Sequence, residues 1–426
     1  MRSLGKSLRN SVPAIGLGLM TAIGGLAAVS LAAAPAHAEQ KKPAKVSKAF
    51  GKAMGESVKA SQAGDWQTTL AKADEALQHA ADANQTLDVQ KMRTAAFANL
   101  GDKPNLVTAV EAQIATGALP ADEQKKLREL LASLYSEMGN DAKALELTRT
   151  YVADYGGTPT QYAYIAQASL RAKDYPDTIA MAKKAIAASA AEGKQPEERW
   201  YKMVITAYHE SGDVAGYQTA VAETLKAFPS DDYRRALVMA VDRAPKYDQK
   251  AVLLDVYRAL QGVGVSLSDK EKLSMGSLAM RAAMPNEAEK LLKPLFDAGT
   301  FGGAGDPNAA ETKDLYERAK TDAKSDRNGG LVSSEKTAAK AATGVVYVAT
   351  GEAYMGMDDP AKAAELIQKG IEKGGLSADD LALAQLRLGV AQYKAGRVEE
   401  AKKTWAGINA ENGAAELARA WSLFAS

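Results

Sequence analysis

The stretch Leu386–Ile408, LRLGVAQYKAGRVEEAKKTWAGI, decides how this chain folds. It is rich in residues that favour an α-helix, yet it contains Gly389 and Gly396. A glycine inside a helix costs about 1 kcal/mol relative to alanine, so each glycine must supply a geometry that a larger residue cannot. The spacing of similar turns along the chain indicates which geometry that is.

Short turns recur along the chain at a nearly constant interval. From Val46 onward the apolar residues follow a helical period, and no alternating run is long enough for a strand. The turns begin at Gly64, Gly101, Gly139, Lys173, Gly212, Pro245, Ala283, Asp358 and Gly396. The interval between the first five turns is close to that of an internal repeat of two helices. The interval after Ala283 is twice as long as the others, so one repeat there is degenerate or replaced.

A two-helix period of this size resembles the tetratricopeptide repeat (TPR) family. The last repeat shows the motif best, with Leu388-Gly389, Tyr393, the turn at Gly396, Ala401 and Trp405. The preceding repeat has Tyr347, Gly351, Tyr354, Ala363 and Ile367. The resemblance implies that Gly389 and Ala401 let two antiparallel helices approach closely. It also implies that Gly396 ends the first helix in a left-handed conformation.

Each hairpin of this kind buries one face only when the next hairpin covers it. The expected fold is therefore all-α, a right-handed superhelical solenoid of about nine two-helix repeats. The final segment, Ala414 to Phe424, is expected to be the capping helix of the array. Four parts are predicted: a signal peptide (1–38), an N-terminal TPR-like array (39–298), a Gly-rich charged insertion with one lone helix (299–334), and C-terminal repeats with the cap (335–426).

The N-terminus has the pattern of a secretory signal. Arg2, Lys6 and Arg9 precede a long apolar run, and Ala36-His37-Ala38 forms a small-x-small cleavage pattern. Cleavage after Ala38 would leave a soluble chain with a net charge of about −2. The predicted location is the periplasm of a Gram-negative-type cell. The alternative is an uncleaved leader that anchors the chain in the inner membrane.

Composition argues against several classes of function. The near-neutral charge gives no reason to expect nucleic acid or an anionic membrane as a partner. No cysteine is present, so neither disulfides nor thiol chemistry is expected. His79 and His209 lie far apart without metal-ligand spacing, and no GxSxG motif occurs. We expect no enzyme activity, no cofactor and no metal.

The TPR resemblance implies a concave groove, lined by the first helix of each pair, that holds an extended peptide or a partner helix. The groove residues carried over are Gln167, Arg171, Arg199, Lys202, Thr206, His209, Glu352, Val390, Tyr393 and Lys394. The peptide-binding members clamp a C-terminal carboxylate with Lys and Asn residues. Lys202 matches one such Lys, but Thr206 stands where Asn would be, and this departure argues against a carboxylate clamp.

The predicted function is a periplasmic, non-enzymatic scaffold or adaptor that binds a protein or peptide in its groove. By family analogy, envelope assembly or export is a plausible setting. Two alternatives remain open: an α-superhelical protein that binds peptidoglycan or polysaccharide, and a subunit of a complex anchored in the inner membrane.

Overall fold

The computed structural model describes residues 44–303 and 306–426, and every regular element in these residues is helical. The expected signal peptide lies outside them. The chain divides into two compact units, one ending at Ala168 and the other beginning at Ser169. The predicted boundaries of the insertion therefore both fall inside the second unit.

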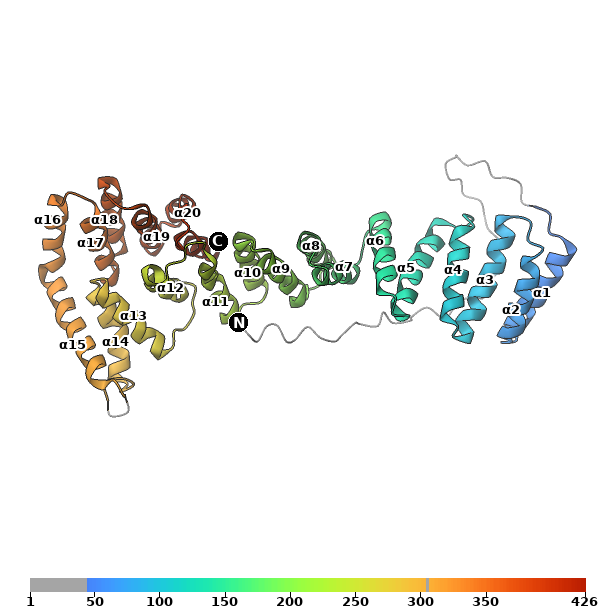
Figure 1. The fold of residues 1–426 in the computed structure, drawn as a ribbon, viewed down its shortest axis with the longest axis horizontal. Coiled ribbons are helices and arrows are strands. Elements are labelled where there is room, and N and C mark those ends of the chain that lie inside the picture. The colour runs from blue at the N-terminus through green and yellow to red at the C-terminus, as the bar shows by residue number, and fades with distance from the viewer. Residues whose placement is uncertain (1–43, 304–305) are drawn as a thin grey trace. The chain divides into compact units, whose positions relative to one another are not determined.

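The first unit consists of antiparallel helical hairpins (Figure 1). Its helices are α1 (Lys48–Gln62), α2 (Trp66–Leu77), α3 (Ala83–Leu100), α4 (Lys103–Ala115), α5 (Ala121–Glu137) and α6 (Asp141–Tyr155). Helix α7 (Pro159–Arg171) carries the boundary between the units. Consecutive helices from α1 to α6 pack against one another, as the prediction of stacked hairpins requires.

The second unit continues the hairpins and ends in a single helix. Its helices are α8 (Tyr175–Ala191), α9 (Glu198–Ser211), α10 (Val214–Ala227), α11 (Asp231–Met239), η1 (Ala240–Arg243), α12 (Gln249–Gly262), α13 (Asp269–Arg281), α14 (Pro285–Asp297), α15 (Ala309–Ser325), η2 (Asp326–Gly330), α16 (Leu331–Lys340), α17 (Val345–Gly356), α18 (Pro360–Lys373), α19 (Ala378–Lys394), α20 (Val398–Ala406) and α21 (Ala414–Phe424).

One turn geometry joins the two helices of nearly every hairpin. Eight of the nine predicted turn positions have a positive φ, and three of these are not glycine: Lys173 (60°), Ala283 (55°) and Asp358 (58°). In each case the next residue donates its N–H to a carbonyl five positions earlier, at 2.9 to 3.1 Å. This is the Schellman arrangement, and it turns the chain within two residues. The ninth position, Pro245, cannot adopt a positive φ, because the proline ring fixes φ at a negative value.

The residue after the left-handed position often begins the second helix as its cap. The side chains of Asp65, Asp102, Asn140, Asp174, Asp213 and Asp359 each accept a hydrogen bond from the third N–H of the following helix. Such caps satisfy N–H groups that the helix itself leaves free. A left-handed residue followed by Asp or Asn therefore encodes most of the hairpins in the local sequence.

Small residues let the paired helices approach, as the last repeat predicts. A Cβ atom at Gly389 would overlap the ring of Trp405, whose indole N–H donates to the carbonyl of Leu386 at 3.2 Å. Gly351 is equally tight against Ile367, and Gly276 against Leu292. Gly276 has the same place relative to its turn as Gly351 and Gly389, so a third repeat has the same small residue.

The segment expected to be an insertion with one lone helix is instead an integral part of the second unit. Helix α15 packs against α14, and α16 packs against α17. The two helices are joined by a kink, η2, in which Asn328 and Gly329 leave the helical φ/ψ region. Gly329, with φ 108°, makes the bend. Helices α14 and α17 also touch each other directly. The long bent helix formed by α15 and α16 packs against both of them and takes the place of the missing hairpin (Figure 1).

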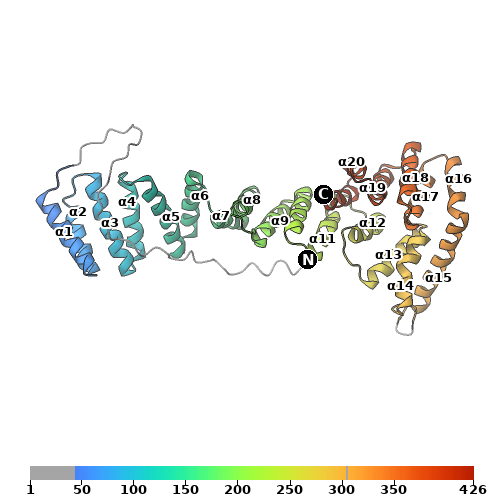
Figure 2. The same cartoon turned by 180° about the vertical axis from the view of Figure 1, so that it is seen from behind.

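Helix α21 has the expected bounds, but it is not an exposed cap. It packs against α19 and α20 and also against α10, α11, η1 and α12, all of which lie far earlier in the sequence. Figures 1 and 2 show the C-terminus beside α10 and α11. The turn at Pro245 joins this contact, since the N–H of Lys246 donates to the carbonyl of Glu411 at 2.8 Å. The second unit therefore closes on itself, which a linear array would not do.

The left-handed alanine at Ala283 should be strained, because its exposed Cβ atom gains no packing there. This conformation costs a residue with a Cβ atom roughly 1–2 kcal/mol, whereas glycine adopts it almost freely. We expect Ala283→Gly to raise the free energy of unfolding by about 0.5–1 kcal/mol, measured by urea denaturation. Gly212→Ala, the matched control, should lower it by about 1 kcal/mol. Destabilisation by Ala283→Gly would contradict this account of the turn.

Candidate functional site

The predicted groove residues fall into two groups when they are counted back from their turns. Thr206 and Val390 occupy equivalent positions before the left-handed glycine that ends their helix, and so do His209 and Tyr393. Lys202 likewise corresponds to Leu386. These positions are polar on α9 and largely apolar on α19. The same face of the two helices must therefore meet different surroundings.

On α9 the predicted residues form an exposed polar stripe. The side chains of Arg199, Lys202 and His209 are 47, 43 and 41 % exposed, and Thr206 is half-buried between them. Each charged group has a partner on the same helix or just before it, of which the Lys202–Glu198 pair, at 3.0 Å, is typical. Such exposed pairs are weak and leave the groups available to a partner.

Glu198 ties this stripe to the next hairpin. Its carboxylate accepts a hydrogen bond of 2.6 Å from the hydroxyl of Tyr233 on α11. That bond, followed by the bond from Lys202, lowers the pKa of Glu198. Burial and the same carboxylate raise the pKa of Tyr233. The stripe is therefore anchored at one end by a neutral phenol and a charged carboxylate at neutral pH.

On α17 and α19 the predicted groove face lies inside the protein. Glu352 is 5 % exposed and Val390 is 6 % exposed, and Tyr393 packs against Trp421 with ring centroids 5.7 Å apart. Glu352, Val390 and Tyr393 were expected on an open groove, but the structure covers them with other helices. Helices α12 and α21 cover the face, because its side chains are apolar or are neutralised by buried partners.

Trp421 of α21 fills the centre of this covered face. It is 2 % exposed and stacks on Trp405 of α20 with centroids 6.0 Å apart. On its other side a Cβ atom at Gly262 would overlap the indole ring, so α12 can meet α21 only with glycine there. The side-chain amide of Gln218 adds two bonds from its nitrogen, to the carbonyls of Leu237 and Glu416. The chain thus places its own helix where a partner helix was expected.

The remaining predicted residues are placed as follows. Gln167 is half-buried in the first unit, and Arg171 is exposed in the second. Lys394, at the end of α19, is exposed. In spite of this exposure, neighbouring side chains remove enough of its hydration to lower its pKa. Glu287 and Asp358 act in the opposite direction, and the cations Arg258 and Lys290 lower the pKa further.

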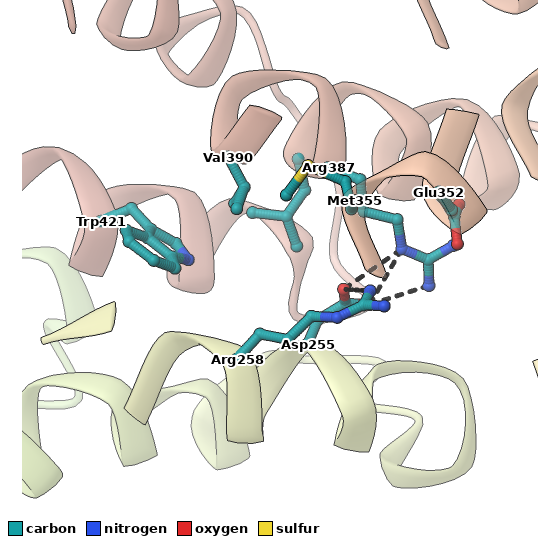
Figure 3. Close-up of a pocket in the computed structure, with 8 residues that line it drawn as sticks. Asp255, Arg258, Glu352, Met355, Arg387, Val390 and Trp421 are labelled. Atoms are coloured by element: carbon teal, nitrogen blue, oxygen red, sulfur yellow. Dashed lines mark hydrogen bonds and ion pairs between the residues drawn. The ribbon is translucent and has the colours of Figure 1, made fainter. Parts of the chain in front are cut away.

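A buried network of charges lies beside Trp421 (Figure 3). Arg387 of α19 forms two hydrogen bonds to Asp255 of α12 through Nε, at 3.2 and 3.1 Å, and a third through Nη2 at 2.8 Å. Its Nη1 donates to Glu352 at 2.7 Å. Arg258 bonds to Glu287 of α14 at 3.0 and 2.5 Å and to Asp255 at 3.3 Å. Two guanidinium groups therefore join four helices.

Three groups of the network are held in their charged forms by one another. Burial would raise the pKa of Asp255, but Arg387 and Arg258 outweigh it and hold the pKa below its ordinary value. Burial would lower the pKa of both arginines, but the carboxylates raise it instead. The adjoining cavity has a volume of about 20 Å³, room for roughly one water molecule. The arrangement locks the four helices together.

Sequence reasoning missed both the network and the closure. Asp255 and Arg387 are far apart along the chain, and no short motif links them. A usable signal was present in the apolar character of Leu386, Val390 and Tyr393. A groove face that binds a polar partner should not be apolar, and an apolar face of this kind predicts a covering element.

No protein-family profile and no curated protein matches the chain, whereas solved structures do. A solved tetratricopeptide repeat protein from Parabacteroides merdae is 11% identical, with 81% of this chain and 100% of that chain covered and a TM-score of 0.27. The fold is TPR-like. The hairpins, their left-handed turns and the small residues between their helices carry that conclusion, and they confirm the prediction of an all-α solenoid.

Two further similarities are with complexes. The TPR2AB domain of yeast Sti1, solved with an HSP90 peptide, is 14% identical, with 64% of this chain and 98% of that chain covered and a TM-score of 0.25. The Naa15/Naa10 complex bound to HypK is 12% identical, with 84% and 62% covered and a TM-score of 0.32.

Two features are absent from the part of the chain that the structure describes. None of the helices in residues 44–303 and 306–426 combines the length and the apolar character needed to cross a bilayer. In the same residues, no three or more His, Asp or Glu side chains come together where they could hold a metal ion.

Replacing Arg387 with methionine should destabilise the second unit strongly. The change leaves Asp255 and Glu352 buried without their main partner, which costs about 3–5 kcal/mol at neutral pH. The folded pKa of Asp255 is depressed, so its stabilising contribution is present above its unfolded pKa and is lost as the pH falls through the folded value.

The difference in unfolding free energy between the wild type and Arg387→Met should therefore shrink below about pH 4, measured by urea denaturation across pH. The matched control is Arg397→Met, whose exposed pair with Glu400 should matter by less than about 1 kcal/mol. Equal, small effects of the two substitutions would show that the network does not hold the helices together.

Proposed function

We propose that this protein is a non-enzymatic scaffold that binds a protein or peptide on the exposed polar face of α9. The observation that carries the proposal is the contrast between two equivalent helix faces. The face of α19 holds a helix, α21, supplied by the chain itself. The corresponding face of α9 consists of Arg199, Lys202, Thr206 and His209, and in the described part of the second unit these side chains are exposed or half-buried.

The chemistry of the α9 face supports a polar partner segment. Arg199 and Lys202 offer donors to carboxylates or backbone carbonyls, and the Thr206 hydroxyl offers both a donor and an acceptor. Their present partners, Glu197 and Glu198, are exposed and local, so a partner can replace them at little cost. A face of this kind gives specificity through several moderate contacts rather than through one residue.

We place the scaffold in the periplasm, and we propose envelope assembly or export as its setting. The sequence of the leader supports this location, with a basic start, an apolar run and Ala36-His37-Ala38 before the first helix. N-terminal sequencing of the protein from a cell envelope should give Glu39 as the first residue. A chain that retains Met1 in the membrane fraction would replace this proposal with the membrane-anchored alternative.

Photo-crosslinking from the α9 face should test the scaffold function directly. A photoreactive residue at Thr206 is expected to capture one protein in the native envelope, whereas the same residue at Lys183 on α8 should not. Lys202→Glu should reduce the capture from Thr206 by about tenfold, because it adds a negative charge where a cation is needed.

The control is Lys226→Glu on α10, an exposed lysine that is not one of the four residues of the α9 face. Equal capture from Thr206 and Lys183, or capture of glycan in place of protein, would contradict the proposal.

A further inference from the structure

A second polar cleft lies away from α9, where the long bent helix replaces a hairpin. It has a volume of about 360 Å³, and its lining comes from α14, the η2 kink and the turn between α17 and α18. Its charged lining residues are Glu289, Lys290, Lys293, Arg327 and Asp358. A volume of this size accommodates a few side chains of a ligand, unlike the small cavity beside Asp255.

Hydrogen bonds and an ion pair hold the walls of the cleft in place. Asn286, 5 % exposed, donates to Asp326 at 3.1 Å and accepts a bond of 2.8 Å from Arg327. Arg327 also pairs with Glu289 at 2.7 Å, so the kink is fixed to α14. On the opposite side, a Cβ atom at Gly356 would be 2.9 Å from the backbone nitrogen of Glu287, which sets the close contact of α17 with α14.

Two lysines of this cleft have anionic partners that are exposed and exchangeable, whereas Arg327 stays fixed to Glu289 in the wall. Lys290 and Asp358 are paired at 2.5 Å with side chains 62 and 73 % exposed, and Lys293 pairs with Asp297. Pairs this exposed contribute little to stability. Electrostatic interaction with Lys290 and Asp358 also connects Lys394 to the cleft. An incoming carboxylate can take the place of Asp358 without unfolding any element.

One backbone carbonyl of α14, in a residue that lines the cleft, lacks its usual hydrogen-bond donor. Pro294 lies inside α14 and has no N–H, so the carbonyl of Lys290 lacks its usual helical donor. Both residues line the cleft, together with the apolar side chain of Met357. A peptide can present carboxylates to the lysines and an N–H to a carbonyl, whereas an anion without a donor, such as sulfate, can do only the first.

We propose that this cleft binds an acidic peptide segment through Lys290 and Lys293, with Arg327 holding the wall beside them. The site is distinct from the α9 face and does not depend on the function proposed for it. In the absence of the segment, Asp358 forms an ion pair with Lys290 and so competes with the carboxylates of the segment. The carboxylates of the segment would come from aspartate or glutamate side chains or from a chain end, and the same cations recognise both.

Fluorescence anisotropy of a labelled peptide of alternating aspartate and alanine, with blocked ends, tests the proposal on the full chain. The double variant Lys290→Gln/Lys293→Gln should weaken binding by about tenfold or more. Asp358→Asn should strengthen binding several-fold, because it removes the internal competitor, and asparagine tolerates the left-handed backbone there. Lys369→Gln/Lys402→Gln, which removes two lysines outside the cleft lining, should change nothing.

Three outcomes would overturn the proposal. The wild-type chain could fail to bind the aspartate peptide, or it could bind a peptide with asparagine in place of aspartate with the same affinity. The third is that the two double variants lose the same amount of affinity. Competition by inorganic phosphate at equal strength would also overturn it, since it would show a simple anion site. A peptide with blocked side chains and a free C-terminus distinguishes the two sources of carboxylate. Circular dichroism of each variant confirms that the helices are retained.

Discussion

The contact between Trp421 and Gly262 is the constraint on which the second unit depends. A large indole ring occupies the space that any other residue of α12 would need for its Cβ atom. Burial of a tryptophan side chain stabilises a fold by a few kcal/mol, and here the burial joins segments that are far apart in the sequence. Because α21 touches both α10–α12 and α19–α20, one helix makes the hairpins between them a closed body.

The buried ion pairs of Arg387 and Arg258 lie beside Trp421, but they contribute specificity rather than net stability. Ion pairs in a low-dielectric interior contribute little net stability, since the loss of hydration offsets the attraction. Their geometry is specific, however, because Arg387 engages Asp255 with three hydrogen bonds and Glu352 with one. The apolar contact at Trp421 supplies the stability, and the guanidinium geometry selects the register in which α12, α17 and α19 meet.

Local sequence determined the hairpins well, and the long-range closure poorly. The turns, the small residues at Gly351 and Gly389 and the bounds of α21 could be predicted, because each depends on neighbours within a few positions. The burial of Glu352 and Val390 could not, because it depends on α12 and α21, which pack there from distant parts of the chain. The bent helix of α15 and α16 was missed for a related reason. Gly329-Gly330 has the composition of a linker, but in the structure it makes only a short kink between α15 and α16, and those two helices pack against α14 and α17.

The closed unit also changes how the groove prediction should be applied. Four of its residues lie together on α9, where polar side chains remain exposed, and this is the part of the prediction that the geometry brings together. The face on α19 is already occupied by the chain. A scaffold with one occupied face and one open face presents a defined binding surface, instead of a uniform groove along the whole array.

The most direct test of the closure uses the absence of cysteine from the chain. Lys246 and Glu411 are joined by a backbone hydrogen bond and by an ion pair of 2.8 Å, so Lys246→Cys with Glu411→Cys places two thiols within bridging range. Oxidation of the purified double variant should give an intramolecular disulfide, seen as a monomer of altered mobility on a non-reducing gel. Failure to form the bridge, or formation of dimers only, would contradict the closure of the second unit by α21.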